Sequence, residues 1–296
     1  MRTFLINRLV VVAALSAALL FVSAHASAQS AQSGGSPDGS VSGANAGRTV
    51  RHAPSEPPSP TPRTPDGKPD FSGIWDGGGG NINRDLPGKQ LPYTPAGEAA
   101  YQYNMTKAID PQSLCIIIGE PRADVDGRPF EIVQNSTRVA FLFERDASRR
   151  VIRIGSQHPA DPEPSFFGDA VGTWDGDTLV VDVVGLKGEK VWADNVGHPH
   201  SDATHLIERW SRPDANTLLL QLTIQDPKYY TKPITFTRKL RRQLWDEVDE
   251  EACDENNVDR DHLGPGLGTK DGTRGFDRSL TGSFPAAAPG QTGQNQ

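Results

Sequence analysis

The sequence lacks the short motifs that mark several large enzyme classes. It contains no Gly-x-Ser-x-Gly elbow, no His-Glu-x-x-His pair, no dinucleotide fingerprint and no internal repeat. The run Gly77–Gly80 follows no long apolar strand and opens no helix, so we expect a flexible loop there and no phosphate cradle. These absences argue against motif-defined serine hydrolases, zinc proteases and nucleotide-binding folds.

Positive charge is in deficit as well. The chain has 30 Lys and Arg against 37 Asp and Glu, a formal net charge of -7 at pH 7. Nucleic acid attracts basic surfaces, so this balance argues against a nucleic-acid partner. The most acidic run, Asp246–Glu255, lacks the residue order of a calcium loop and is predicted to be a solvated face.

The only long apolar run lies at the N-terminus. Arg2 and Arg8 precede the apolar stretch 9–24, and the small residues around Ala28 form a possible cleavage site for signal peptidase. We therefore predict a signal peptide over 1–28, export to the periplasm or the cell exterior, and no membrane span after cleavage. The alternative is an uncleaved anchor, for which the apolar run is short.

Composition divides the rest of the chain into three parts. Residues 29–63 are rich in Ser, Gly, Ala and Pro and predict a disordered linker, and 263–296 predict a disordered tail. Residues 64–262 are long enough for one domain with its own hydrophobic core. The two cysteines, Cys115 and Cys253, are predicted to pair because export permits a disulfide, with two buried free thiols as the alternative.

Apolar residues alternate with a period of two through most of this domain. In 217–225 the even-numbered positions are Leu or Ile, the pattern of an antiparallel strand with one buried face. Turn residues such as Asp175-Gly176 separate the predicted strands, which are 130–136, 138–144, 149–155, 169–174, 178–185, 204–210, 217–225, 234–240 and 243–248.

Roughly eight consecutive strands joined by tight turns predict a mainly β protein, a single antiparallel meander β-barrel of the lipocalin or calycin-like kind. Such a barrel holds one small ligand in its interior or mouth. A two-sheet β-sandwich is the alternative. One short helix near the start of the domain is predicted from the Thr94 cap and Pro95 to a stop at Ile109-Asp110-Pro111.

Several segments are specific enough to suggest a family. Thr64–Trp75 reads TPDGKPDFSGIW, and the other segments are Leu91–Gly97, Pro129–Gln134, Trp174–Asp182, Gly197–Trp210, Asp226–Arg238 and Cys253–Asn257. They resemble a large group of uncharacterised exported bacterial proteins with a Pro-Asp-Leu-Ser-Gly-x-Trp motif after the signal and linker. The resemblance implies an exported β-rich domain and names no reaction. Members often carry a His where this chain reads Gly168-Asp169-Ala170, so if that His helps to build a site, the chemistry of the site is altered here or is carried by Asp169.

Reactive side chains gather in the segment 197–205. Three of the seven histidines, His198, His200 and His205, fall within eight residues. Imidazole binds metals and moves protons near neutral pH. His198 and His200 would face the same side of an extended loop, so one hypothesis is a divalent-metal site completed by a carboxylate. Metal-free acid/base or binding chemistry is the second hypothesis, and histidines that only fix a turn are the third.

Neighbouring residues would complete such a site. Asp194 would orient one of the two proton-moving histidines, His200 or His205. The residues expected to bind a ligand are Trp192, Tyr229, Tyr230, His158 and Asp169. Of the two tyrosines, one is expected to pack and the other to line the site. The alternative for Trp192 is a lid over the barrel end.

The sequence therefore predicts an exported protein that acts on a small polar or aromatic molecule. The leading prediction is a metal-free acid/base enzyme of lyase, isomerase or cyclase type at the barrel mouth. The alternatives are a non-catalytic lipocalin-like ligand-binding protein and a metal-dependent enzyme. The sequence indicates no cofactor other than the divalent metal of that last alternative.

Overall fold

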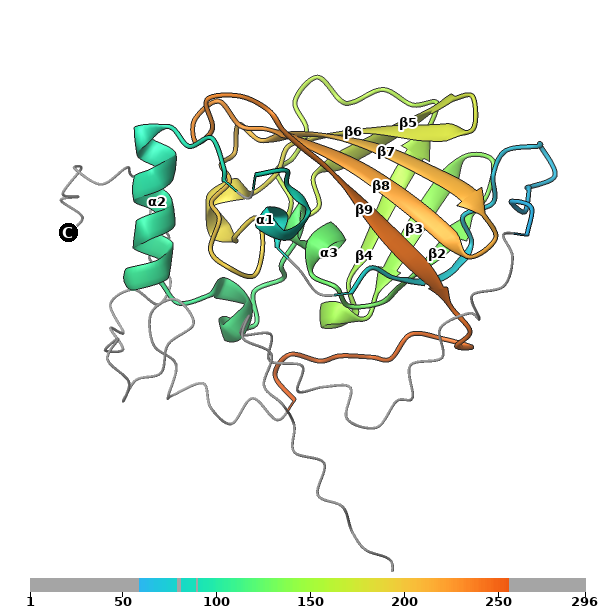
Figure 1. Cartoon of the computed structure of the whole chain (residues 1–296), viewed down its shortest axis with the longest axis horizontal. Coiled ribbons are helices and arrows are strands. Elements are labelled where there is room, and N and C mark those ends of the chain that lie inside the picture. Colours follow the sequence, from blue (N-terminus) through green and yellow to red (C-terminus); the bar gives the residue numbers. More distant parts are fainter. Residues whose placement is uncertain (1–58, 79–80, 89, 256–296) are drawn as a thin grey trace, which may run out of the picture. The chain divides into compact units, whose positions relative to one another are not determined.

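A closed β-barrel forms the centre of the described part of the chain, residues 59–78, 81–88 and 90–255 of a computed structural model (Figure 1). Its strands are β1 (Gly73–Asp76), β2 (Phe130–Gln134), β3 (Arg138–Phe143), β4 (Arg149–Ile154), β5 (Asp169–Asp175), β6 (Thr178–Val184), β7 (His205–Asp214), β8 (Thr217–Gln225) and β9 (Ile234–Gln243). The predicted mainly β barrel is confirmed, and the sandwich alternative is wrong. The predicted signal peptide, the predicted tail and residues 29–58 lie outside the described residues.

The strands follow one another around the barrel in sequence order, and β9 closes it against β1, where Ile74 lies opposite Gln243. Among the described strands, β4 and β5 form the one parallel pair, with Arg153 opposite Val171. The long connection 155–168 between them carries the chain back before β5 starts, as a parallel pair requires. The prediction of an entirely antiparallel meander is therefore wrong at this pair.

Alternation along the strands places apolar side chains inside the barrel. In β8 the side chains of Leu218, Leu220, Leu222 and Ile224 are fully buried, as the period of two predicts. Aromatic rings meet among them, and the Phe141 and Trp210 ring centroids lie 5.2 Å apart. The middle of the barrel is thus a packed core.

The predicted helix is present as α2 (Pro95–Thr106). Thr94 caps it, since its Oγ1 accepts from the Gly97 N–H at 3.0 Å, and Pro95 opens the first turn. The other helical segments are single turns, too short to give a helical period in the sequence: α1 (Ile82–Asp85), α3 (Arg122–Val125), η1 (Pro111–Leu114), η2 (Arg145–Ala147) and η3 (Gly188–Lys190). Within the described ranges, no helix combines the length and apolar character needed to cross a membrane.

Two strand ends differ from the prediction. β7 extends to Asp214, beyond the predicted strand 204–210, and a register shift between Ser211 and Asp214 accommodates Pro213. β9 extends to Gln243 because its last residues pair with β1, and 244–248, predicted as a further strand, are not in a strand. Both differences depend on strand pairing, which a local pattern does not contain.

The described chain starts inside the predicted linker. Thr61 Oγ1 donates to the Arg212 carbonyl at 2.7 Å, and Arg63 forms two hydrogen bonds to Asp177, at 2.7 and 3.0 Å. Residues 59–63 therefore lie against the barrel, and the domain begins before Thr64.

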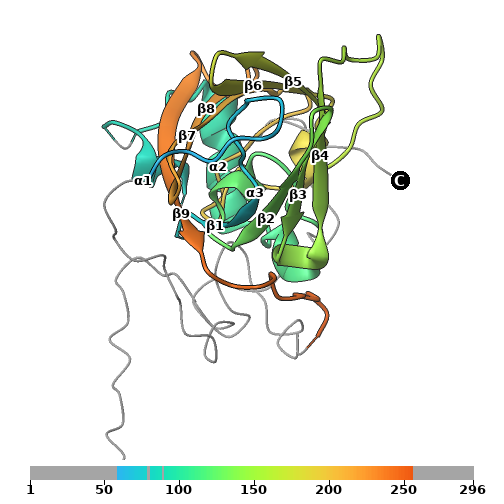
Figure 2. The ribbon, with the colours of Figure 1, turned by 90° about the vertical axis from the view of Figure 1, so that its right-hand side faces the viewer.

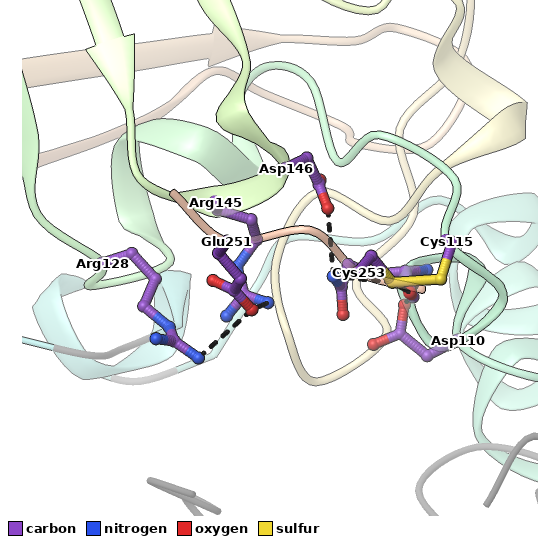
Figure 3. The surroundings of a disulfide bond; sticks show 8 residues. Asp110, Cys115, Arg128, Arg145, Asp146, Glu251 and Cys253 are labelled. Atoms are coloured by element: carbon purple, nitrogen blue, oxygen red, sulfur yellow. Dashed lines mark hydrogen bonds and ion pairs between the residues drawn. A yellow bond between two sulfur atoms is a disulfide. The ribbon is translucent and has the colours of Figure 1, made fainter. Parts of the chain in front are cut away.

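A disulfide joins Cys115 to Cys253, as predicted, with the two Cα atoms 5.4 Å apart (Figure 3). It links the segment before α3 to the segment after β9, which runs back past the end of β3 and β4 (Figure 2). Beside it, Arg128 and Arg145 each lie 3.4 Å from Glu251. The acidic run expected to be a solvated face is thus partly ion-paired to the barrel.

Replacing both cysteines by Ser should lower the free energy of unfolding by about 4–5 kcal/mol, because the bridge removes the closure entropy of a long loop from the unfolded chain. Urea unfolding of the oxidised protein and of the Cys115→Ser/Cys253→Ser variant measures this difference. The wild-type protein under reducing conditions is the matched control and should lose the same amount. Equal unfolding midpoints for all three samples would contradict the prediction.

Candidate functional site

The three histidines of 197–205 occupy three different environments. His198 pairs with Asp194, and His205 pairs with Asp182. His200 is buried, and its ring has no hydrogen-bond partner among the described residues. Within the described residues, no three His, Cys, Asp or Glu side chains are grouped as a metal site requires. The expected metal face of His198, His200 and His205 is not assembled.

Asp194 and His198 form a buried dyad. The distance from Asp194 Oδ2 to His198 Nδ1 is 2.5 Å, and the two residues are 0% and 1% exposed. The same carboxylate shapes the loop, since it accepts from the backbone N–H groups of Ile82 at 2.9 Å, Val196 at 3.1 Å and His198 at 3.3 Å. Asp194 was predicted to orient His200 or His205, but the imidazole that it contacts is that of His198.

The electrostatics of the dyad place the shared proton on Nδ1 of His198. Burial alone would raise the pKa of Asp194, but the facing His198 and the N–H groups of Ile82 and Val196 hold that pKa below its ordinary value. An ionised Asp194 requires the Nδ1 of His198 to be the donor. The lone pair of a neutral imidazole then lies on Nε2, which is the arrangement of a general base.

A row of tyrosine rings borders the dyad. The Tyr101 ring, on α2, stacks on the imidazole of His198 with centroids 5.1 Å apart, and Tyr93 lies 5.7 Å from Tyr101 and 5.5 Å from Tyr230. The Tyr93 hydroxyl is buried and has no hydrogen-bond partner in the described part of the chain. Burial raises the pKa of Tyr93, so this hydroxyl stays protonated and can donate.

Tyr93 and Tyr101 were not predicted as site residues, although both lie near the predicted helix start at Thr94. Of the residues predicted to bind a ligand, Trp192 and Tyr229 are 3% and 4% exposed, and Tyr229 belongs to the main hydrophobic core. Tyr230 is also buried, and its hydroxyl donates to the Pro199 carbonyl at 2.6 Å. Both neighbouring tyrosines therefore pack, where one was expected to face the ligand.

His158, Asp169 and His205 meet through Asp182, a residue that the sequence analysis did not select. The His158 ring lies 2.6 Å from Asp169 Oδ1 and 3.1 Å from Asp182 Oδ1, and His205 Nε2 lies 2.9 Å from that same Asp182 atom. Asp182 alternates with the buried Val181 and Val183 of β6, so this group lies on the outer wall of the barrel. Its side chain is 44% exposed, and solvent weakens these pairs. The group ties the 155–168 connection to the barrel.

His200 is buried, and neither ring nitrogen has a hydrogen-bond partner among the residues described. Burial lowers its pKa to about 4, and the neighbouring Asp226 opposes this shift. His200 is therefore neutral at pH 7. Asp226 accepts instead from Ser201 N at 2.6 Å and from Thr204 Oγ1 at 3.0 Å, which fixes the turn after His200.

The barrel end near α3 encloses a charged cluster that the sequence analysis missed. Arg150, on β4, lies 3.1 Å from Glu120, 3.7 Å from Asp124 and 2.5 Å from Glu208. All four side chains are at most 1% exposed. Trp210 Nε1 donates to the second oxygen of Glu208 at 2.8 Å. The available signal was Glu208 itself, a charged residue between Leu206 and Trp210 on the apolar face of its strand.

Three carboxyl groups share one guanidinium in this Arg150 cluster. Burial raises the pKa of Glu120 to about 7, and it raises the pKa of Asp124 well above its ordinary value, while Arg150 acts in the opposite direction. Asp124 is paired with Arg150 less closely than the other two carboxyl groups are, at 3.7 Å. The cluster therefore retains protons at neutral pH, a property of both acid/base sites and buried structural networks.

The raised pKa of Glu120 makes stability depend on pH. Because the pKa of Glu120 is higher in the folded than in the unfolded protein, its protonation favours the folded state. This contribution to stability is complete below the ordinary pKa of 4.5 and is lost as pH rises through about 7. Glu120→Gln, which resembles the protonated acid, should flatten the fall in melting temperature between about pH 5 and 8. Glu131→Gln, on β2 outside the cluster, is the matched control and should keep the wild-type slope. Parallel slopes for all three proteins would contradict the assignment.

Removing the central cation should destabilise the cluster. Arg150→Met leaves three buried carboxyl groups without compensation and should lower the free energy of unfolding at pH 7 by about 3–5 kcal/mol. The loss should be smaller near pH 5, where more of these groups are protonated. Urea unfolding at both pH values measures it. The exposed neighbour provides the control, since Arg149→Met should change stability by less than about 0.5 kcal/mol.

Comparison with protein-family models and with curated proteins found no match to the chain. The resemblance carried by 64–75 and 197–210 therefore stays a prediction. The dyad of Asp194 and His198 is the candidate functional site on its geometry alone.

Proposed function

We propose that this protein is an exported enzyme that moves protons on a small molecule, with His198 as the acid/base group and Asp194 as its positioning residue. The observation that carries the proposal is the 2.5 Å hydrogen bond between these two fully buried groups. A carboxylate that fixes the tautomer and orientation of an imidazole is the usual support of a histidine general base.

The tyrosines beside the dyad favour a small aromatic or planar polar substrate. Tyr101 stacks on one face of His198 and is itself only partly buried, so rotation of its side chain would open a path to the imidazole. The unpartnered hydroxyl of Tyr93 would donate to a carbonyl or hydroxyl oxygen of the substrate. His198 Nε2 would take a proton from the substrate and return it at another atom or to a leaving group, which are isomerase and lyase chemistry.

The alternative of a non-catalytic lipocalin-like binder is less well supported. A lipocalin-like barrel holds its ligand inside, and here aromatic and aliphatic side chains occupy the interior. The proposed export rests on the N-terminal segment, and the disulfide of Cys115 and Cys253 is compatible with it, since disulfides persist in oxidising compartments.

Proton transfer to solvent is the most general readout of this proposal. The protein would be incubated in D2O with a panel of small ketones, phenols and hydroxy acids, and exchange of C–H for C–D would be followed by NMR. We expect catalysed exchange for at least one compound. His198→Gln should lower its rate by about 10²–10⁴-fold, and Asp194→Asn should act in the same direction. Both rates are compared below the melting temperature of each variant, because either change removes one partner of a buried pair and should lower stability.

His205→Gln, on the outer wall, is the matched control and should keep the wild-type rate. The proposal fails if wild-type protein catalyses no exchange in the panel, or if His198→Gln exchanges as fast as wild type. A loss confined to His205→Gln would move the chemistry to the group around Asp182.

A further inference from the structure

A pocket of about 530 Å³ lies between η3 and the connection that precedes β5, and neither the dyad nor the Arg150 cluster lines it. Its apolar lining consists of Ile116, Pro164, Phe166 and Leu186. Its charged lining consists of Lys187, Lys190 and Asp202. A volume of this size, lined mostly by apolar groups with a few charges, is typical of small-ligand sites.

The backbone holds the walls of this pocket in place. A Cβ on Gly188 would lie 1.9 Å from the Ser201 carbonyl carbon, and one on Gly119 would lie 2.1 Å from the Phe166 carbonyl oxygen. The main chain is therefore in direct contact at both places. Backbone hydrogen bonds add to these contacts, from Lys187 N to Ser165 O and from Glu120 N to Phe166 O, both at 2.9 Å. A preformed pocket loses little entropy when a ligand enters.

The charges indicate which ligand would enter. Two lysines and one aspartate give the lining a positive balance in a protein whose net charge is -7. The Lys187 ammonium lies 5.2 Å from the centroid of the Phe166 ring, so a cation stands at the edge of the apolar surface. Asp202 would repel a second negative group, which favours one anionic group over two.

We propose that this pocket binds an amphipathic monoanion, a small aliphatic or aryl carboxylate. Its hydrocarbon part would pack on Phe166 and Leu186, and its carboxylate would meet Lys187 and Lys190. The proposal is independent of the proposed proton-transfer function. It requires neither the dyad nor turnover.

Isothermal titration with octanoate, 1-octanol and octylamine at low ionic strength tests it. These probes share a hydrocarbon chain and differ in charge. We expect octanoate to bind in a 1:1 ratio and up to about fivefold more tightly than 1-octanol, the gain that one exposed charge contact supplies. Octylamine should bind most weakly. Absent octanoate binding, or tighter binding of octylamine, would overturn the proposal.

Two variants locate the binding. Lys187→Gln/Lys190→Gln should weaken octanoate to the affinity of 1-octanol and leave 1-octanol unchanged, whereas Lys239→Gln on β9 should change neither. Ile116→Trp fills the pocket and should weaken both probes. Because the lysines are exposed, the double variant should keep the wild-type melting temperature. An unchanged octanoate affinity in that variant would show that the carboxylate binds elsewhere.

Discussion

Closure of the barrel between β1 and β9 is the constraint on which the rest of the structure depends. Residues near the start and the end of the domain pair there, with Trp75 opposite Arg242. An open edge would expose the inward face of β9 and the Trp75 ring, which is fully buried in the closed form. Closure also gives all nine described strands one shared interior, and the low dielectric constant of that interior strengthens every charge interaction inside it.

Buried carboxylates organise the loops outside this barrel. Asp194 fixes the loop that carries His198, and Asp226 fixes the turn that contains Ser201 and Thr204. Each carboxylate accepts from backbone N–H groups and from one or more side chains, so loop conformation and side-chain orientation are set together. This explains how histidines two residues apart have different surroundings, one paired and one without a partner in the described chain.

The ionisable groups of the protein differ in how deeply they are buried and in their partners, and the two together decide which of them keep their charge. Around Asp182 on the outer wall, solvent reaches the charges, and their pairs serve to hold a connection against the barrel. Around Arg150, complete burial raises the pKa values of Glu120 and Asp124. Protonation of these carboxyl groups then reduces the negative charge that the single guanidinium has to balance. The dyad of Asp194 and His198 is as deeply buried as the Arg150 cluster, yet its carboxylate keeps its charge. The attraction of the facing His198 and the hydrogen bonds that Asp194 accepts outweigh the cost of burial.

The sequence by itself determined the local features. The alternation in 217–225 predicted β8 and its buried face, and Thr94 with Pro95 predicted the start of α2, because these patterns depend only on nearby residues. It also identified the segment 197–205 as unusual. Only the tertiary structure decided that Asp194 holds His198, that β4 and β5 are parallel, and that Arg150 meets Glu208 inside the barrel. The β4–β5 pair joins neighbouring strands through a long connection, the Arg150–Glu208 contact joins strands that are not neighbours in the sheet, and the dyad depends on how a folded loop packs. They are therefore set by closure, register and burial, which no local pattern records.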